Sequence, residues 1–101
     1  MSQRLVADRV VDRLRAIKPM MRALMNTPTY NRHAELQQAS IVDLMAGSTF
    51  GADDVARISK EVHECALPAQ VQASIIVSLV NSGANNANTR VKLQDYVNFV
   101  N

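Results

Sequence analysis

Three side chains that can ligate a metal or attack a substrate stand together at His63, Glu64 and Cys65. The surrounding pattern predicts a helix here, and successive side chains on a helix point about 100° apart, so these three do not converge on one ion. A zinc site needs four ligands that meet, and Cys65 is the single cysteine of the chain. We therefore interpret Cys65 as a small core residue and His63 as a residue at the edge of the buried face, and we expect no metal and no cofactor.

Nucleophilic catalysis by Cys65 would need an imidazole beside the thiol, and His33 is the one histidine outside this cluster. Nothing in the sequence brings these two residues together. The three glycines lack the spacing of a phosphate-binding loop. Asp53 and Asp54 are accounted for as residues of the first turn of a helix, where negative charge is favoured. We expect the protein not to be an enzyme.

The formal charge of the chain is distributed unevenly along its length. Residues 1–33 contain seven of the eleven basic residues and two acidic ones, whereas residues 34–101 contain four basic and seven acidic ones, giving +5 and −3 within the total of +2. Such asymmetry indicates an interaction surface for an anionic partner. When the first segment is projected on a helix, four basic side chains form one narrow row, which we name the basic ridge: Arg4, Arg15, Lys18 and Arg22.

The basic ridge has three interpretations: a merely solvated face, a docking face for a protein with an acidic surface, or a surface that contacts phosphates. Asp8 and Asp12 stand at helical neighbour spacing from Arg4 and Arg15 and are expected to neutralise them in part. No aromatic residues are interleaved with the basic ones, which argues against stacking on single-stranded nucleic acid. A second candidate surface is acidic and comprises Asp53, Asp54, Glu61 and Glu64.

The first two predicted helices lie on either side of a Thr-Pro pair. Apolar residues recur at helical spacing over residues 3–26, and Pro19 inside this segment predicts a kink or break nearby, because proline lacks the backbone N–H and crowds the preceding turn. Thr27 is the predicted N-cap of the second helix and Pro28 lies in its first turn. Gly47 is expected to end this helix just after residue 46.

The third and fourth predicted helices meet at Leu67-Pro68. The third begins near Asp53 and carries a narrow apolar stripe. The fourth, at about residues 68–82, has no charged residue and is apolar over most of its circumference, which predicts a central, buried helix. Residues 90–101 fit both a helix and a strand, and we favour a helix because a single strand would have no partner. The stripe of the third helix comprises Val55, Ile58, Val62, Cys65 and Ala66.

These segments predict an all-α fold: a compact single-domain bundle over residues 1–101, with about five helices, the fourth central and the first kinked near Pro19. The length of 101 residues provides one core. The composition, 48% hydrophobic and 20% charged, is typical of a soluble globular protein. The apolar run Ala73–Val80 is far shorter than the ~20 residues that cross a bilayer. The single cysteine and an N-terminal segment interrupted by charges favour a cytoplasmic location.

The sequence therefore favours a small non-catalytic binding protein, such as an adaptor, regulator or inhibitor, that docks on another macromolecule through the basic ridge of its N-terminal helix. Two alternatives stay open. One is a nucleic-acid-binding module that uses the same helix on phosphates, and the other is a homo-oligomerisation domain of a longer chain. Nucleic-acid binding falls steeply with salt, whereas a protein interface with an apolar centre persists. The identity of the partner and the oligomeric state are not encoded in any motif of the sequence.

The helical periodicity predicts a far-UV circular dichroism spectrum dominated by α-helix, because the three-to-four spacing repeats in at least four segments bounded by proline or glycine. The measurement needs only the purified chain in neutral buffer. A spectrum dominated by β-structure would contradict the all-α architecture.

Overall fold

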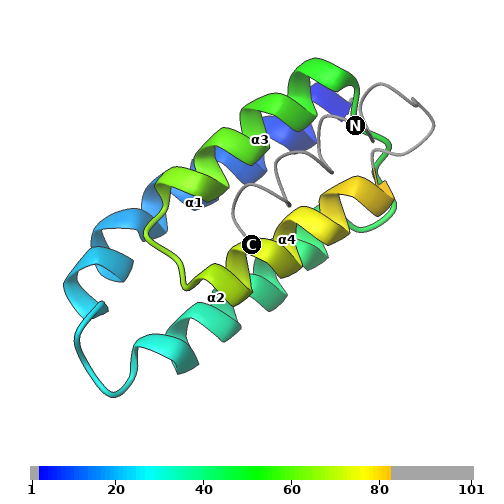
Figure 1. Cartoon of the computed structure of the whole chain (residues 1–101). Coiled ribbons are helices and arrows are strands. Elements are labelled where there is room, and N and C mark those ends of the chain that lie inside the picture. The colour runs from blue at the N-terminus through cyan, green and yellow to red at the C-terminus, as the bar shows by residue number, and fades with distance from the viewer. Residues whose placement is uncertain (1–2, 83–101) are drawn as a thin grey trace.

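The computed structural model describes residues 3–82, and this part of the chain forms four helices and no strand (Figure 1). In chain order they are α1 (Gln3–Leu24), α2 (Tyr30–Met45), α3 (Ala52–Glu64) and α4 (Ala69–Ser82). The all-α prediction is confirmed for these residues, with four helices rather than about five. The expected last helix, at residues 90–101, lies outside the described residues. Among the four helices, none is long and apolar enough to cross a membrane.

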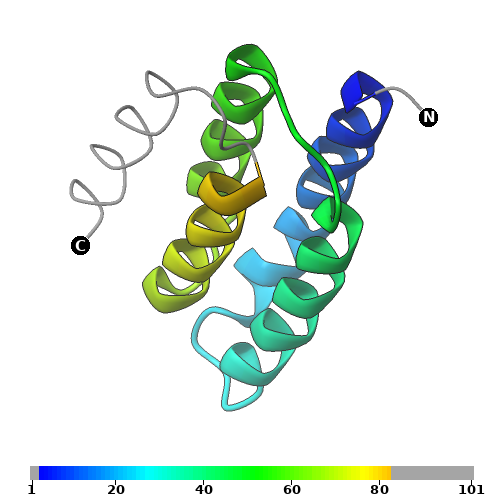
Figure 2. The ribbon, with the colours of Figure 1, turned by 90° about the vertical axis from the view of Figure 1, so that its right-hand side faces the viewer.

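The four helices form a ring in which each helix contacts two others. α1 packs against α2 and α3, and α4 packs against the same two helices, while the backbones of the diagonal pairs α1/α4 and α2/α3 do not approach as closely. Figure 2 shows the result as two layers, one of α1 and α2 and the other of α3 and α4. α2 and α4 run in the same direction (Figure 1). Their starting ends are joined by the Tyr30 hydroxyl, which donates to the Ala66 carbonyl at 2.6 Å.

α1 contributes the longest buried stripe of the bundle, and it is helical through Pro19 without a break. Ile17 and Met21 on either side of the proline are both buried in the same core, so continuing the helix keeps both side chains out of water. Of the predicted kink or break near Pro19, the break does not occur, whereas the kink stays a prediction. The buried residues of α1 are Ala7, Val10, Val11, Leu14, Ile17 and Met21.

The turn between α1 and α2 corrects the predicted cap. The backbone N–H and the hydroxyl of Thr27 both donate to the Leu24 carbonyl, at 2.9 and 2.8 Å, so Thr27 closes α1 instead of opening α2. Thr29 occupies the N-cap position of α2, without a side-chain capping bond. The end of α2 is as predicted. Gly47 has a φ of +77°, a left-handed conformation that glycine adopts without steric cost.

α4 lies at a corner of the ring and not at its centre, which corrects the sequence-based expectation. It buries one face, but Val77 on the opposite side is 49% exposed. Glutamine, serine and alanine alternate with its large apolar residues, so the outer face carries no charge but can be exposed to water at a small free-energy cost. The absence of charged residues in α4 therefore did not mean that the helix is buried on all sides. The buried face comprises Val71, Ile75, Ile76 and Leu79.

Ile76→Asp is expected to abolish folding, because Ile76 is fully buried and an unpaired carboxylate there has neither water nor a partner. The cost is comparable to the ~5–15 kcal/mol that stabilises a typical domain. Val77→Asp, one residue further along α4, is the matched control and should change the thermal midpoint little, as should Lys60→Asp on the exposed face of α3. An Ile76→Asp protein with an unchanged thermal midpoint would contradict the packing of α4.

Candidate protein-binding surface

The four residues of the basic ridge all lie on α1, but the fold does not treat them alike. Arg4, Arg15 and Arg22 are exposed, and Lys18 is half-buried. Arg4 and Arg22 are eighteen residues apart in one helix, which is about 27 Å at about 1.5 Å per residue. A single small contact therefore does not span the whole ridge.

Arg15, in the middle of the ridge, is held by Glu61 of α3. Its Nη2 and Nε atoms lie 2.9 and 3.0 Å from the same carboxylate oxygen, Oε1. The hydrogen bond and the charge of Glu61 raise the pKa of Arg15. The Glu61 side chain is only 13% exposed, whereas that of Arg15 is 65% exposed. Arg15 thus joins α1 to α3 and neutralises a carboxylate that the packing has partly removed from water.

A second set of ion pairs lies further along the seam between α1 and α3. Arg57 of α3 places Nη2 at 2.7 Å from Oδ1 of Asp8 and at 3.1 Å from Oδ1 of Asp54. These hydrogen bonds, that to Asp8 first, raise the pKa of Arg57. The sequence-based expectation paired Asp8 with Arg4 on the same helix, and the fold pairs it across the seam instead. Exposed pairs of this kind contribute about 0–1 kcal/mol each, so they fix the register of the helices more than they stabilise them.

The acidic second candidate surface is divided by the same contacts. Asp54 and Glu61 are the acceptors of the seam pairs just described. Asp53 and Glu64 are exposed and make no ion pair within residues 3–82. The predicted acidic face is therefore half of the α1/α3 seam rather than an independent surface.

Two members of the basic ridge, Lys18 and Arg22, lie beyond the last seam pair. They are one helical turn apart in the C-terminal half of α1, where positive charge is favoured by the helix dipole. Neither forms an ion pair or a side-chain hydrogen bond with a described residue, and the same holds for Arg4 near the other end. The pair Lys18–Arg22 is thus the compact cationic part of the ridge whose charge no described carboxylate neutralises.

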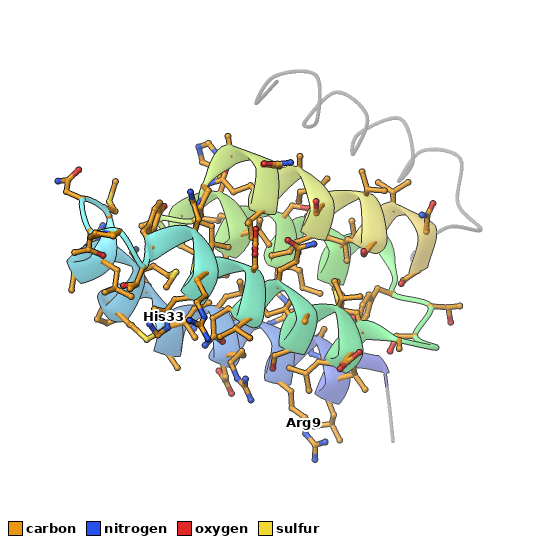
Figure 3. The ribbon with its side chains drawn as sticks, turned by 90° about the horizontal axis from the view of Figure 1, so that it is seen from below. Arg9 and His33 are labelled. Atoms are coloured by element: carbon orange, nitrogen blue, oxygen red, sulfur yellow. The ribbon has the colours of Figure 1, made fainter. Side chains whose placement is uncertain are left out.

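The opposite flank of α1 carries basic residues that the sequence analysis did not single out. Arg13 donates from Nη1 to the Ser40 hydroxyl of α2 at 2.7 Å. Arg9, one turn earlier, points away from the bundle, and His33 lies at the boundary of α1 and α2 (Figure 3). Arg9 and Arg13 are four positions apart, and this spacing is the sequence signal that places them in a second row on α1. Together they border a shallow hollow of about 360 Å³ lined by Arg9, Asp12, Arg13, Ala16 and Leu44.

Cys65 is buried in the core, as predicted, at the end of α3. Its thiol donates to the Leu14 carbonyl at 3.2 Å, and burial raises its pKa to about 11, against a smaller opposing effect from Lys18. The thiol is therefore protonated at neutral pH and is a poor nucleophile. His63 is exposed rather than at the edge of the core. Within residues 3–82, no three His, Cys, Asp or Glu side chains gather in a way that could hold a metal ion.

Comparison with known proteins gives no relative for this chain: no protein-family model matches it, and the searches of curated proteins and of solved structures gave no significant match.

The buried thiol predicts a loss of stability at alkaline pH. Cys65 titrates near 9.0 in its unperturbed state and near 11 in the fold, so the folded chain holds this proton more tightly. The free energy of unfolding contributed by the thiol is complete below about pH 9 and declines as the pH rises towards 11. Burial also raises the pKa of Tyr30, which adds to the same decline.

Urea unfolding at a series of pH values measures this effect. Cys65→Ala should be less stable at pH 7 because it leaves a small cavity, but its stability should fall less steeply between about pH 9 and 11 than that of the parent chain. Cys65→Ala with the parental slope would show that the thiol does not titrate as the burial implies.

Proposed function

We propose that this chain is a small non-catalytic binding protein that docks on an acidic surface of another protein through the C-terminal half of α1. Lys18 and Arg22 make the contact, and Arg4 is an outlying cation on the same ridge. The observation that carries the proposal is the contrast along α1. The middle arginine of the ridge is occupied by Glu61, whereas Lys18 and Arg22 are left without an acidic partner among residues 3–82. A pair of unneutralised cations attracts a partner surface of opposite charge and gives the contact specificity.

A protein partner is favoured over nucleic acid by the carboxylates of the α1/α3 seam. Asp8, Asp54 and Glu61 lie between Arg4 and the Lys18–Arg22 pair and already occupy Arg15 and Arg57, so a phosphate backbone following α1 would pass a stretch with three carboxylates and two paired arginines. α1 also has no aromatic residue on which a base could stack. A compact acidic protein surface needs only the short cationic stretch at the end of the helix.

Lys18→Glu with Arg22→Glu is expected to remove binding while leaving the fold intact, because neither side chain makes an ion pair or a hydrogen bond within residues 3–82. Two favourable charges become two repulsive ones, so affinity should fall by at least about tenfold, the equivalent of about 1.4 kcal/mol. The measurement is quantitative capture of partners from a nuclease-treated lysate of the native host. Arg15 is left unchanged, since Arg15→Glu would place a second carboxylate beside Glu61.

Arg9→Glu with Lys60→Glu is the matched control, because it makes the same change of net charge at exposed cations off the ridge. It should retain every partner that the double ridge variant loses. Equal capture by the two variants would exclude the ridge as the docking surface. Loss of all captured material after nuclease treatment, together with a steep salt dependence for a duplex oligonucleotide, would favour the nucleic-acid-binding alternative.

A further inference from the structure

The seam between α2 and α4, on the opposite side of the ring from α1 and α3, contains a groove that the bundle does not fill. Its larger hollow measures about 620 Å³ and its smaller one about 340 Å³. The two share four lining residues from both helices, so they are parts of one groove that follows the two parallel helices. The shared residues are Gln38, Ala39, Gln70 and Ser74.

The walls of the groove suit the close approach of another helix. Val42 and Val77 provide apolar surface, and Val77 is 49% exposed although it belongs to a helix without any charge. Ala39, Ala73 and Ser78 present short side chains, which leave room for the larger apolar side chains of a partner. Helix-in-groove recognition uses apolar residues at positions i, i+3, i+4 and i+7 of the bound helix in such a seam.

The charges at the groove are of one sign. Glu35 lines the smaller hollow and Asp43 the larger one, and no Lys, Arg or His among residues 3–82 lines either. The two acidic residues are eight positions apart on α2, which is about 12 Å along the helix axis. Both are exposed, and neither makes an ion pair within residues 3–82.

This pattern selects among the classes of occupant. A second copy docked groove to groove would bring the acidic residues Glu35 and Asp43 of both chains together, which is a like-charge contact. A nucleic acid bound in the groove would meet the two carboxylates and no cation from the described part of the chain. A helix with basic residues about two turns apart can form an ion pair with each of the two acidic residues while its apolar face fills the groove.

We infer that the α2/α4 groove is a docking site for an amphipathic helix of a partner protein, with Lys or Arg at positions about eight residues apart flanking its apolar face. This site is independent of the proposed α1 surface. It lies on the opposite seam of the ring and selects the opposite charge. The chain then has two faces that two partners can occupy at the same time.

The test uses the full chain and two synthetic helical peptides with the same Leu/Ala face. One peptide carries Lys at positions eight residues apart, and the other carries Glu there. Fluorescence anisotropy should show binding of the Lys peptide. Glu35→Lys with Asp43→Lys should weaken it by at least about tenfold and create binding of the Glu peptide, because the charge preference is reversed. Asp53→Lys with Glu64→Lys, the same charge change at exposed carboxylates of α3, should leave binding of the Lys peptide within about twofold.

Absence of Lys-peptide binding, or an equal effect of the two charge reversals, would overturn the inference. A second experiment identifies a competing occupant. In Val77→Cys the new thiol should react with a thiol reagent at the rate of an exposed cysteine, because position 77 is half-exposed. Cys65 is buried and protonated, so it should contribute little to the labelling. Slow labelling that becomes faster on dilution would assign the groove to a second copy. Slow labelling at every concentration would assign it to the chain's own remaining residues, and either result would contradict a partner helix.

Discussion

The burial of one stripe of α1 against two helices at once is the constraint on which the bundle depends. Val10, Leu14 and Met21 are fully buried, and each such side chain contributes about 1.5–3 kcal/mol when it is removed from water. α3 and α4 have 13 and 14 residues, lengths at which an isolated helix is marginal in water. Their stability therefore comes from the ring that α1 and α2 complete. The contact of the Cys65 thiol with the Leu14 carbonyl is a direct product of this packing.

The same packing decides which charges stay available. When the apolar stripe of α1 faces inward, its polar flank lies along α3, and the seam is bridged by Arg15 to Glu61 and by Arg57 to Asp8. These pairs are exposed enough to add little free energy, but they occupy the side chains that form them. Beyond the last of these ion pairs lies the C-terminal end of α1 with Lys18 and Arg22. A ridge of four basic residues in the sequence is thus a pair and an outlier in the fold.

The ring gives the protein two opposed seams of different character. The α1/α3 seam is charged and closed by ion pairs, with Lys18 and Arg22 beyond one end unpaired within residues 3–82, whereas the α2/α4 seam is grooved and lined by small, apolar and uncharged polar side chains together with Glu35 and Asp43. The two seams lie on opposite sides of the ring. The two proposals together describe an adaptor that brings an acidic protein surface and a basic amphipathic helix to the same small body.

The sequence by itself determined the features that depend on local spacing. Helical periodicity identified the buried residues Val55, Ile58, Val62 and Cys65 of the third helix, and Gly47 marked the end of α2, because a residue's face on a helix and its backbone preference are properties of a few neighbouring positions. The basic ridge was also visible as a pattern on one helix. The pattern did not show that Arg15 is paired with Glu61 whereas Lys18 and Arg22 have no ion pair within residues 3–82.

The tertiary structure alone decided the partners of each face. Arg15 and Glu61 are 46 positions apart and Arg57 and Asp8 are 49 apart, and no local pattern shows that α3 lies beside α1. The apolar composition of α4 predicted a central helix, but its place at a corner depends on how three other helices share their apolar stripes. The groove along α2 has the same origin. Periodicity tells which face of a helix leaves water, whereas only the packing of all the faces together determines what each one meets.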